Sequence, residues 1–154
     1  AAGTAWAAAG GASAAAPTAE VRYALPAAPP APILRGFDAV GRYDPGHRGV
    51  DLGVSPGAVA LAAADGDVVF AGPVAGRGVV VLAHADGIRT TYEPVAPAVA
   101  VGQRVLRGDG LGQVVGTHGP FPEGSALHWG ARRGEDYVDP LALLRRLGPV
   151  RLVP

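Results

Sequence analysis

The chain has 154 residues, which suits one domain with a modest hydrophobic core. Its 13 basic and 13 acidic side chains give a formal net charge of zero, and the basic residues are not clustered enough to indicate a nucleic-acid-binding surface. Cysteine is absent, so the chain has no disulfides and no thiolate ligands for a metal.

Residues 1–32 are rich in Ala, Gly, Pro and Ser and carry almost no aliphatic pattern. Within them, residues 27–32 (Ala-Ala-Pro-Pro-Ala-Pro) are typical of an extended, semi-rigid linker. The start of the chain lacks an initiator Met and a basic n-region, so it is not a complete signal peptide, and it is too weakly apolar for a membrane span. We interpret residues 1–32 as a disordered tail or linker that the domain does not need for its stability.

From residue 33 to residue 148, short runs rich in Val and Leu alternate with Gly, Asp-Gly and Pro. This pattern predicts an all-β fold, a small Gly-rich antiparallel sheet or barrel-sandwich hybrid. We expect strands near residues 50–54, 59–61, 67–72, 78–84, 88–93, 104–106, 111–115, 126–131 and 136–138. The Ala85-Asp86-Gly87 step predicts a hairpin between two of these strands.

One short helix is predicted at the C-terminal end of the domain, over residues 139–146. Asp139 is a suitable N-cap, and Pro140 suits the first turn. Arg145 and Arg146 fall in the last turn, and Gly148 follows them, as at many helix ends. We expect this helix to cover one end of the sheet.

Two histidines and one carboxylate form a candidate metal site: His47, Asp51 and His128. Three such ligands suit zinc, with the fourth tetrahedral position left for water. On a straight strand the Cα atoms of His47 and Asp51 would lie ~13 Å apart, so the backbone must bend between them, and Gly49 permits a bend. The alternative is a surface His and Asp beside a glycine turn.

The surrounding motifs favour the metal site, because they follow one another in a recognisable order. They read His47-x-Gly49-x-Asp51, Ala64-Asp65-Gly66-x-Val68, Thr90-x-Tyr92, Val101-Gly102-x-x-Val105, Leu127-His128-Trp129 and Asp139-Pro140. Over roughly residues 36 to 144 this order resembles the lysostaphin/LytM-type zinc metallopeptidases, which cut peptide cross-links of bacterial cell-wall peptidoglycan. The resemblance implies zinc as cofactor, His47, Asp51 and His128 as its ligands, and an extracytoplasmic location. It also implies peptidoglycan peptides or a cell-wall hydrolase as partner.

The chain departs from that family at two positions. The family usually has a His two residues after the Tyr of its Thr-x-Tyr motif, where this chain has Pro94. It also usually has a His-x-His pair, whose first His is Ala126 here. The resemblance therefore implies that both non-ligand catalytic histidines are replaced. A positioned base typically adds ~10²–10⁴-fold to the rate, so we expect hydrolysis to be very slow or absent.

Three other side chains could bear on the site. Glu93 lies next to the position of a missing catalytic His and could act as a base, as a Glu does in other zinc proteases. We interpret it as pointing to the opposite face from Pro94 on a strand, which argues against that substitution. His118, in a turn-rich loop before the strand of His128, is the candidate catalytic residue, with a solvated loop His as the alternative. His84 is interpreted as a strand-end His rather than a ligand.

Three classes of function stay open at this point. The first is a monomeric zinc metalloendopeptidase that acts on peptidoglycan peptides. The second is a degenerate relative that binds cell wall or regulates a hydrolase. The third is a non-enzymatic β domain in which the His and Asp residues are incidental.

Overall fold

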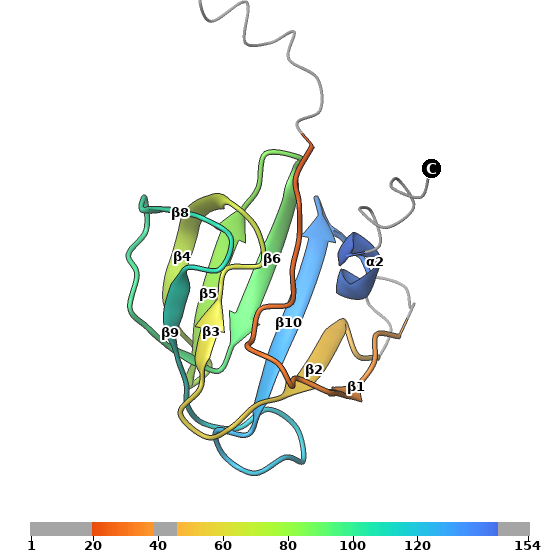
Figure 1. Cartoon of the computed structure of the whole chain (residues 1–154), viewed down its shortest axis with the longest axis vertical. Coiled ribbons are helices and arrows are strands. Elements are labelled where there is room, and N and C mark those ends of the chain that lie inside the picture. Colours follow the sequence, from red (N-terminus) through yellow and green to blue (C-terminus); the bar gives the residue numbers. More distant parts are fainter. Residues whose placement is uncertain (1–19, 39–45, 145–154) are drawn as a thin grey trace, which may run out of the picture.

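The computed structural model describes residues 20–38 and 46–144, and within them two antiparallel sheets make up the fold (Figure 1). The large sheet has the order β1-β2-β10-β6-β5-β4-β8, with β11 paired to β10, and the small sheet has the order β3-β9-β7. The strands are β1 (Ile33–Arg35), β2 (Gly49–Gly53), β3 (Val59–Leu61), β4 (Gly66–Val74), β5 (Arg77–Ala83), β6 (Ile88–Glu93), β7 (Val95–Pro97), β8 (Arg104–Val105), β9 (Gly110–Val114), β10 (Ala126–Arg133) and β11 (Asp136–Tyr137).

The predicted all-β antiparallel fold is confirmed, and each of the nine expected strands is present to within a few residues. The hairpin at residues 85–87 is also confirmed, because β5 and β6 are paired as far as Ala83 and Arg89, on the two sides of this turn. The described residues contain two further strands, β1 and β7, that the sequence did not predict. Both are three residues long and lie beside prolines, which removes the alternating pattern on which the prediction depended.

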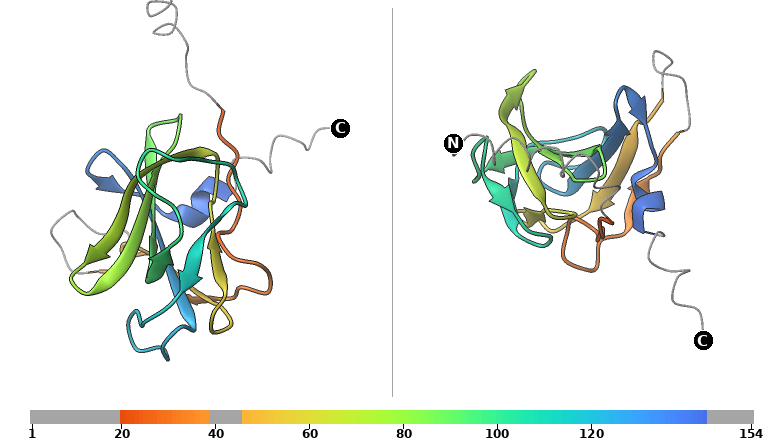
Figure 2. Two further views of the ribbon diagram at one scale, coloured as in Figure 1. Left: turned by 90° about the vertical axis from the view of Figure 1, so that its left-hand side faces the viewer. Right: turned by 90° about the horizontal axis from the view of Figure 1, so that it is seen from above.

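The hydrophobic core lies against one face of the large sheet. Side chains alternate along a strand, and the buried apolar residues follow that alternation: Val50 and Leu52 on β2, Leu127 and Trp129 on β10, and Tyr92 on β6. The small sheet lies over this face (Figures 1 and 2). The residues between these core positions therefore point to the opposite, outer face of the sheet.

Residues 20–32 pack on the domain, in contrast to the tail expected over residues 1–32. Tyr23 is only 3% exposed and belongs to the core, and its hydroxyl donates to the carboxylate of Asp86, with 2.9 and 3.0 Å to the two oxygens. The backbone N–H of Ala24 donates to the carbonyl of Ala63 at 2.8 Å. One aromatic ring thus anchors a segment that is otherwise poor in apolar side chains; residues 1–19 lie outside the described residues.

The helix α2 (Pro140–Leu144) begins as predicted. The Asp139 side chain caps it, because Oδ1 accepts a hydrogen bond from the N–H of Leu141 at 3.0 Å. Leu143 is buried in the core, so the helix covers the end of the sheet at β2 and β10. The expected last turn, residues 145–146, lies outside the described residues. Within the described part of the chain, no helix is long and apolar enough to cross a membrane.

Candidate metal centre

Three polar side chains form a row across adjacent strands on the outer face of the large sheet. Asp51 on β2 pairs with His128 on β10, and His128 pairs in turn with Glu93 on β6. Directly paired residues of antiparallel strands project to the same face. The buried neighbours of each face the core, so this row must face away from it.

His47 reaches this row from the segment before β2. Its Nδ1 donates to the carbonyl of Gly36 at 2.8 Å, and its Nε2 lies 3.2 Å from Oδ1 of Asp51. Gly49, between the two, provides room rather than a left-handed bend. A Cβ at Gly49 would lie 2.5 Å from the carbonyl oxygen of Trp129 and 2.7 Å from Nε2 of His128.

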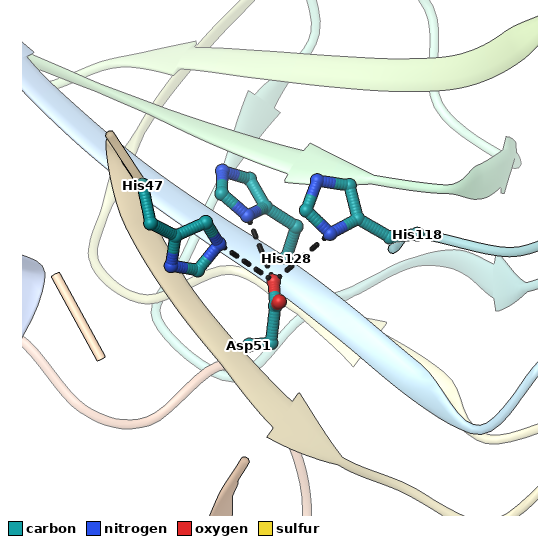
Figure 3. Close-up of side chains that lie close together, drawn as sticks. All are labelled: His47, Asp51, His118 and His128. Carbon is teal, nitrogen blue, oxygen red and sulfur yellow. Dashed lines mark hydrogen bonds and ion pairs between the residues drawn. The ribbon is translucent and has the colours of Figure 1, made fainter. Parts of the chain in front are cut away.

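The loop between β9 and β10 brings His118 to the same place. Its Nδ1 lies 3.0 Å from Oδ1 of Asp51, and its ring lies 4.2 Å from that of His128, centroid to centroid. Figure 3 shows the three imidazoles arranged around one carboxylate. Among the described residues, His47, Asp51, His118 and His128 each offer a ligand atom within 4.8 Å of the others. The structure thus brings the three predicted ligands together and adds His118, so His118 is not a solvated loop residue.

The polar atoms at this centre are spaced like the ligands of a metal ion, and several of them make no well-formed hydrogen bond to one another. The nitrogens of His128, His118 and His47 lie 2.9, 3.0 and 3.2 Å from Oδ1 of Asp51. Four ligand atoms at ~2.0–2.1 Å from a tetrahedral zinc ion would be about 3.3 Å apart. Within the described residues, His47 Nε2, His118 Nδ1 and Asp51 Oδ2 are buried and have no hydrogen-bond partner of good geometry. The cluster could therefore hold a metal ion, and its donor set suits zinc.

The local electrostatics hold two of these groups in the state that binds metal. Burial by itself raises the pKa of the Asp51 carboxyl, but contacts with His118 and His128 outweigh it and keep that pKa well below its ordinary value. Burial also lowers the pKa of His128, and the contact with Asp51 opposes this only in part. At neutral pH, Asp51 is therefore ionised and His128 is neutral, as metal ligands must be.

Glu93 faces the centre, so the prediction that it points away is wrong. Its Oε2 lies 3.6 Å from Nε2 of His118 and 3.5 Å from Nε of Arg77. Alternation correctly separated Glu93 from its neighbour Pro94, but the pairing with His128 decides which of the two faces the metal centre. Tyr92 is the residue from which the face could have been predicted. A large aromatic side chain on β6 belongs in the core, so the next residue, Glu93, must lie on the outer face.

The other candidate residues lie as follows. Ala126 precedes His128 by two residues on β10, so it points to the same face, and it is 1% exposed. His84 is buried at the end of β5, where Nδ1 donates to the carbonyl of Asp65 at 2.8 Å and Nε2 lies 2.7 Å from the hydroxyl of Thr90. His84 is not part of the metal cluster among the described residues, as predicted.

A groove of about 350 Å³ adjoins the cluster. Glu93 and His128 line it on the side of the metal centre, and it runs on past Arg48, Arg132 and other residues. The guanidinium of Arg48 lies 5.2 Å from the centre of a tyrosine ring that also lines the groove. The centre thus adjoins a groove that carries positive charge at the surface of the sheet.

The chain is similar to a mycobacterial protein over most of its length. The chain is 46% identical over 138 residues to an uncharacterized protein, Rv2891, of Mycobacterium tuberculosis, and the match covers 86% of this chain. The chain spans 55% of the length of that relative.

Solved structures share the fold. A zinc containing peptidase from Vibrio cholerae is 25% identical with a TM-score of 0.61, over 74% of this chain and 37% of that one. The catalytic domain of the antimicrobial peptidase lysostaphin from Staphylococcus simulans is 23% identical with a TM-score of 0.62, over 75% of this chain and 92% of that one. Residues 45–140, which include all four side chains of the cluster, match peptidase family M23. The chain therefore belongs to peptidase family M23.

Proposed function

We propose that this chain is a zinc-binding, metalloendopeptidase-like domain that acts outside the cytoplasm on bacterial cell-wall peptidoglycan, and that it hydrolyses peptides very slowly or not at all. The observation that carries the proposal is the convergence of His47, Asp51 and His128 in a domain of family M23. Bound zinc would supply a Lewis acid that polarises a peptide carbonyl. The three side chains would hold the ion on the outer face of the sheet.

The groove supports a peptide as the ligand. It begins at the metal centre and carries Arg48 and Arg132, whose guanidinium groups are suited to the carboxylates of peptidoglycan stem peptides. Its remaining lining includes the apolar side chains Val79 and Val81, against which the alkyl parts of such peptides could pack. Mixed apolar and charged linings of this kind are common in ligand grooves.

Two residues support slow or absent hydrolysis. Pro94 and Ala126 stand where the family resemblance places the histidines that do not bind metal. Neither side chain can hold or move a proton. Neither position can therefore transfer a proton to the leaving nitrogen, and the carboxylate of Glu93, which faces the centre, is paired with Arg77 at 3.5 Å. A positioned base typically contributes ~10²–10⁴-fold to the rate.

A non-catalytic module is the second candidate, in which the domain binds cell wall or regulates a hydrolase. The same two inert side chains favour it, because a binding module needs the groove but not proton transfer. The two candidates differ in one measurable quantity, the release of soluble peptides from cell wall.

The test measures metal content, binding and cleavage on the same sample. One zinc per chain is expected after dialysis against excess zinc, and Asp51→Asn should lower this content. The zinc-loaded chain should sediment with purified cell walls, and the double change Arg48→Gln with Arg132→Gln should weaken this binding. Arg107→Gln, at an exposed arginine outside the groove, is the matched control. A chain that folds but retains no stoichiometric zinc and does not sediment with cell walls would overturn the proposal.

A further inference from the structure

We infer that His118 is a fourth protein ligand of the metal, so that His47, Asp51, His118 and His128 close the site. This inference rests on the proposed function, because it requires that the other three residues bind zinc. It adds that no coordination position is left for an exogenous ligand while the loop of His118 is in place. Sites with four protein ligands hold zinc structurally, whereas catalytic sites keep one position open.

The first argument is the position of the His118 ring. Its Nδ1 lies 3.0 Å from Oδ1 of Asp51, as close as the nitrogens of His128 and His47. Nδ1 is nevertheless buried and has no hydrogen bond of good geometry among the described residues. A buried nitrogen that faces a carboxylate without a well-formed hydrogen bond costs free energy, and a metal cation between the two would remove that cost.

The second argument is the support on the far side of the ring. Metal-binding histidines usually donate their other N–H to a carboxylate or a carbonyl, which fixes the tautomer. His47 does so with the carbonyl of Gly36 at 2.8 Å. His118 directs Nε2 toward Oε2 of Glu93 at 3.6 Å, and Glu93 is itself paired with Arg77. In both residues the outer nitrogen faces an oxygen acceptor and the inner nitrogen faces the cluster, which is the orientation of a metal ligand.

The third argument is the attachment of the loop that carries His118. At its start, the N–H of Val115 donates to the carbonyl of Pro94 at 3.0 Å. Across the loop, the N–H of Gly124 donates to the carbonyl of Gly116 at 2.6 Å, and the carbonyl of Ser125 accepts from Val54 at 2.9 Å. The loop is thus tied to the residues that directly follow β6 and β2, the strands on either side of β10, and it holds His118 over the row of paired side chains.

The consequence is a metal that fastens the loop to the sheet. The ion would join β2, β10 and the loop, and its binding free energy would add to the stability of the folded domain. Peptide hydrolysis would then require His118 to leave the metal. The site would hold its ion firmly while presenting only the neighbouring groove to a ligand.

Cobalt(II) substitution tests the coordination directly, with azide as the probe for an open position. The cobalt-loaded wild-type chain should show a tetrahedral visible spectrum that azide leaves unchanged. His118→Ala should bind zinc at least ~10-fold more weakly, and its cobalt spectrum should shift on addition of azide. Glu123→Ala, at an exposed residue of the same loop, should behave as wild type.

A second measurement needs no variant. The X-ray absorption spectrum of the zinc-loaded wild-type chain should show three imidazoles around the metal. Two imidazoles, or an azide response in the wild type together with unchanged zinc affinity in His118→Ala, would overturn the inference and leave the proposed function standing. Failure of the wild-type chain to bind any zinc would overturn both.

Discussion

The carboxylate of Glu93 faces the ring of His118, with 3.6 Å between Oε2 and Nε2. If Glu93 orients this ring, Glu93→Gln weakens the outer contact without removing a ligand. Loss of such partners typically costs ~10–100-fold in metal affinity, so the zinc dissociation constant should rise within that range. Competition with a chromogenic chelator would measure it, and Glu123→Gln gives the same chemical change at an exposed position. Equal affinities for both variants would mean that Glu93 does not orient His118.

Gly49 is expected to be intolerant of a side chain. A Cβ there would meet the carbonyl oxygen of Trp129 at 2.5 Å, which is backbone and cannot move aside. Gly49→Ala should therefore destabilise the domain by about 1–3 kcal/mol, and it should also displace His128. Urea unfolding and zinc content would measure the two effects. Gly36→Ala is the matched control, because a Cβ there meets nothing within 4 Å; equal loss in both variants would contradict the steric explanation.

Residues 20–32 are expected to be needed for full stability. A chain that starts at Ile33 loses the buried ring of Tyr23 and the backbone hydrogen bonds of the segment with the domain. Loss of a buried aromatic side chain typically costs about 3 kcal/mol or more, which is on the order of 10 °C in Tm. A chain that starts at Glu20 keeps every one of these contacts and serves as the comparison. Identical melting of the two shortened chains would show that the segment is dispensable.

His84 should make the stability of the metal-free domain depend on pH. On one side of the ring, the N–H of Ala63 donates to the oxygen of Tyr92, whose hydroxyl donates to Thr90, and the Thr90 hydroxyl donates to Nε2 of His84. On the other side, Nδ1–H donates to the carbonyl of Asp65. This order requires a neutral imidazole. Burial, the largest cause, lowers the pKa of His84 below its ordinary 6.5, although the Asp65 carbonyl opposes the shift. Burial likewise raises the pKa of Tyr92 to about 12, so its hydroxyl stays protonated.

The sign of the pH effect follows from where protons bind first. As pH falls below 6.5, the unfolded chain takes up a proton at His84 before the folded domain does, so stability present above pH 6.5 is lost toward the lower folded pKa. Urea midpoints at pH 7.5 and pH 5 in the presence of a chelator should differ more for wild type than for His84→Gln. The contribution of His128 is common to both proteins and cancels in this comparison. A His84 pKa at or above 6.5 by NMR would refute the explanation.

The sequence predicted the strands well because the alternation of apolar residues shows which face of each strand is buried, and the glycines between the runs show where strands end. It predicted His47, Asp51 and His128 because they lie within motifs of fixed order. It did not predict the face of Glu93, since alternation gives only relative orientation and the pairing of β6 with β10 fixes the absolute one. It named His118 as a candidate catalytic residue but left a solvated loop residue as the alternative, because the loop is held by backbone hydrogen bonds to distant segments, which leave no periodic pattern.

Hydrolysis is expected to require both an open coordination position and a side chain that can move a proton. The wild-type chain should release no more peptide from purified cell wall, or from short Gly-rich peptides, than a sample with chelator. Ala126→His alone should stay inactive, because His118 still closes the site. The double change Ala126→His with His118→Ala should raise the rate on the order of 10²-fold, the lower range for a positioned base.

Addition of Asp51→Asn to this double variant should abolish the gain, which controls for contaminating proteases. Two results would contradict the closed, degenerate site. Robust metal-dependent turnover by the wild-type chain that His118→Ala removes without change in zinc content would make His118 the base rather than a ligand. Robust turnover that survives His118→Ala would show that neither Pro94 nor Ala126 limits catalysis, because proton transfer would then belong to a group outside this cluster.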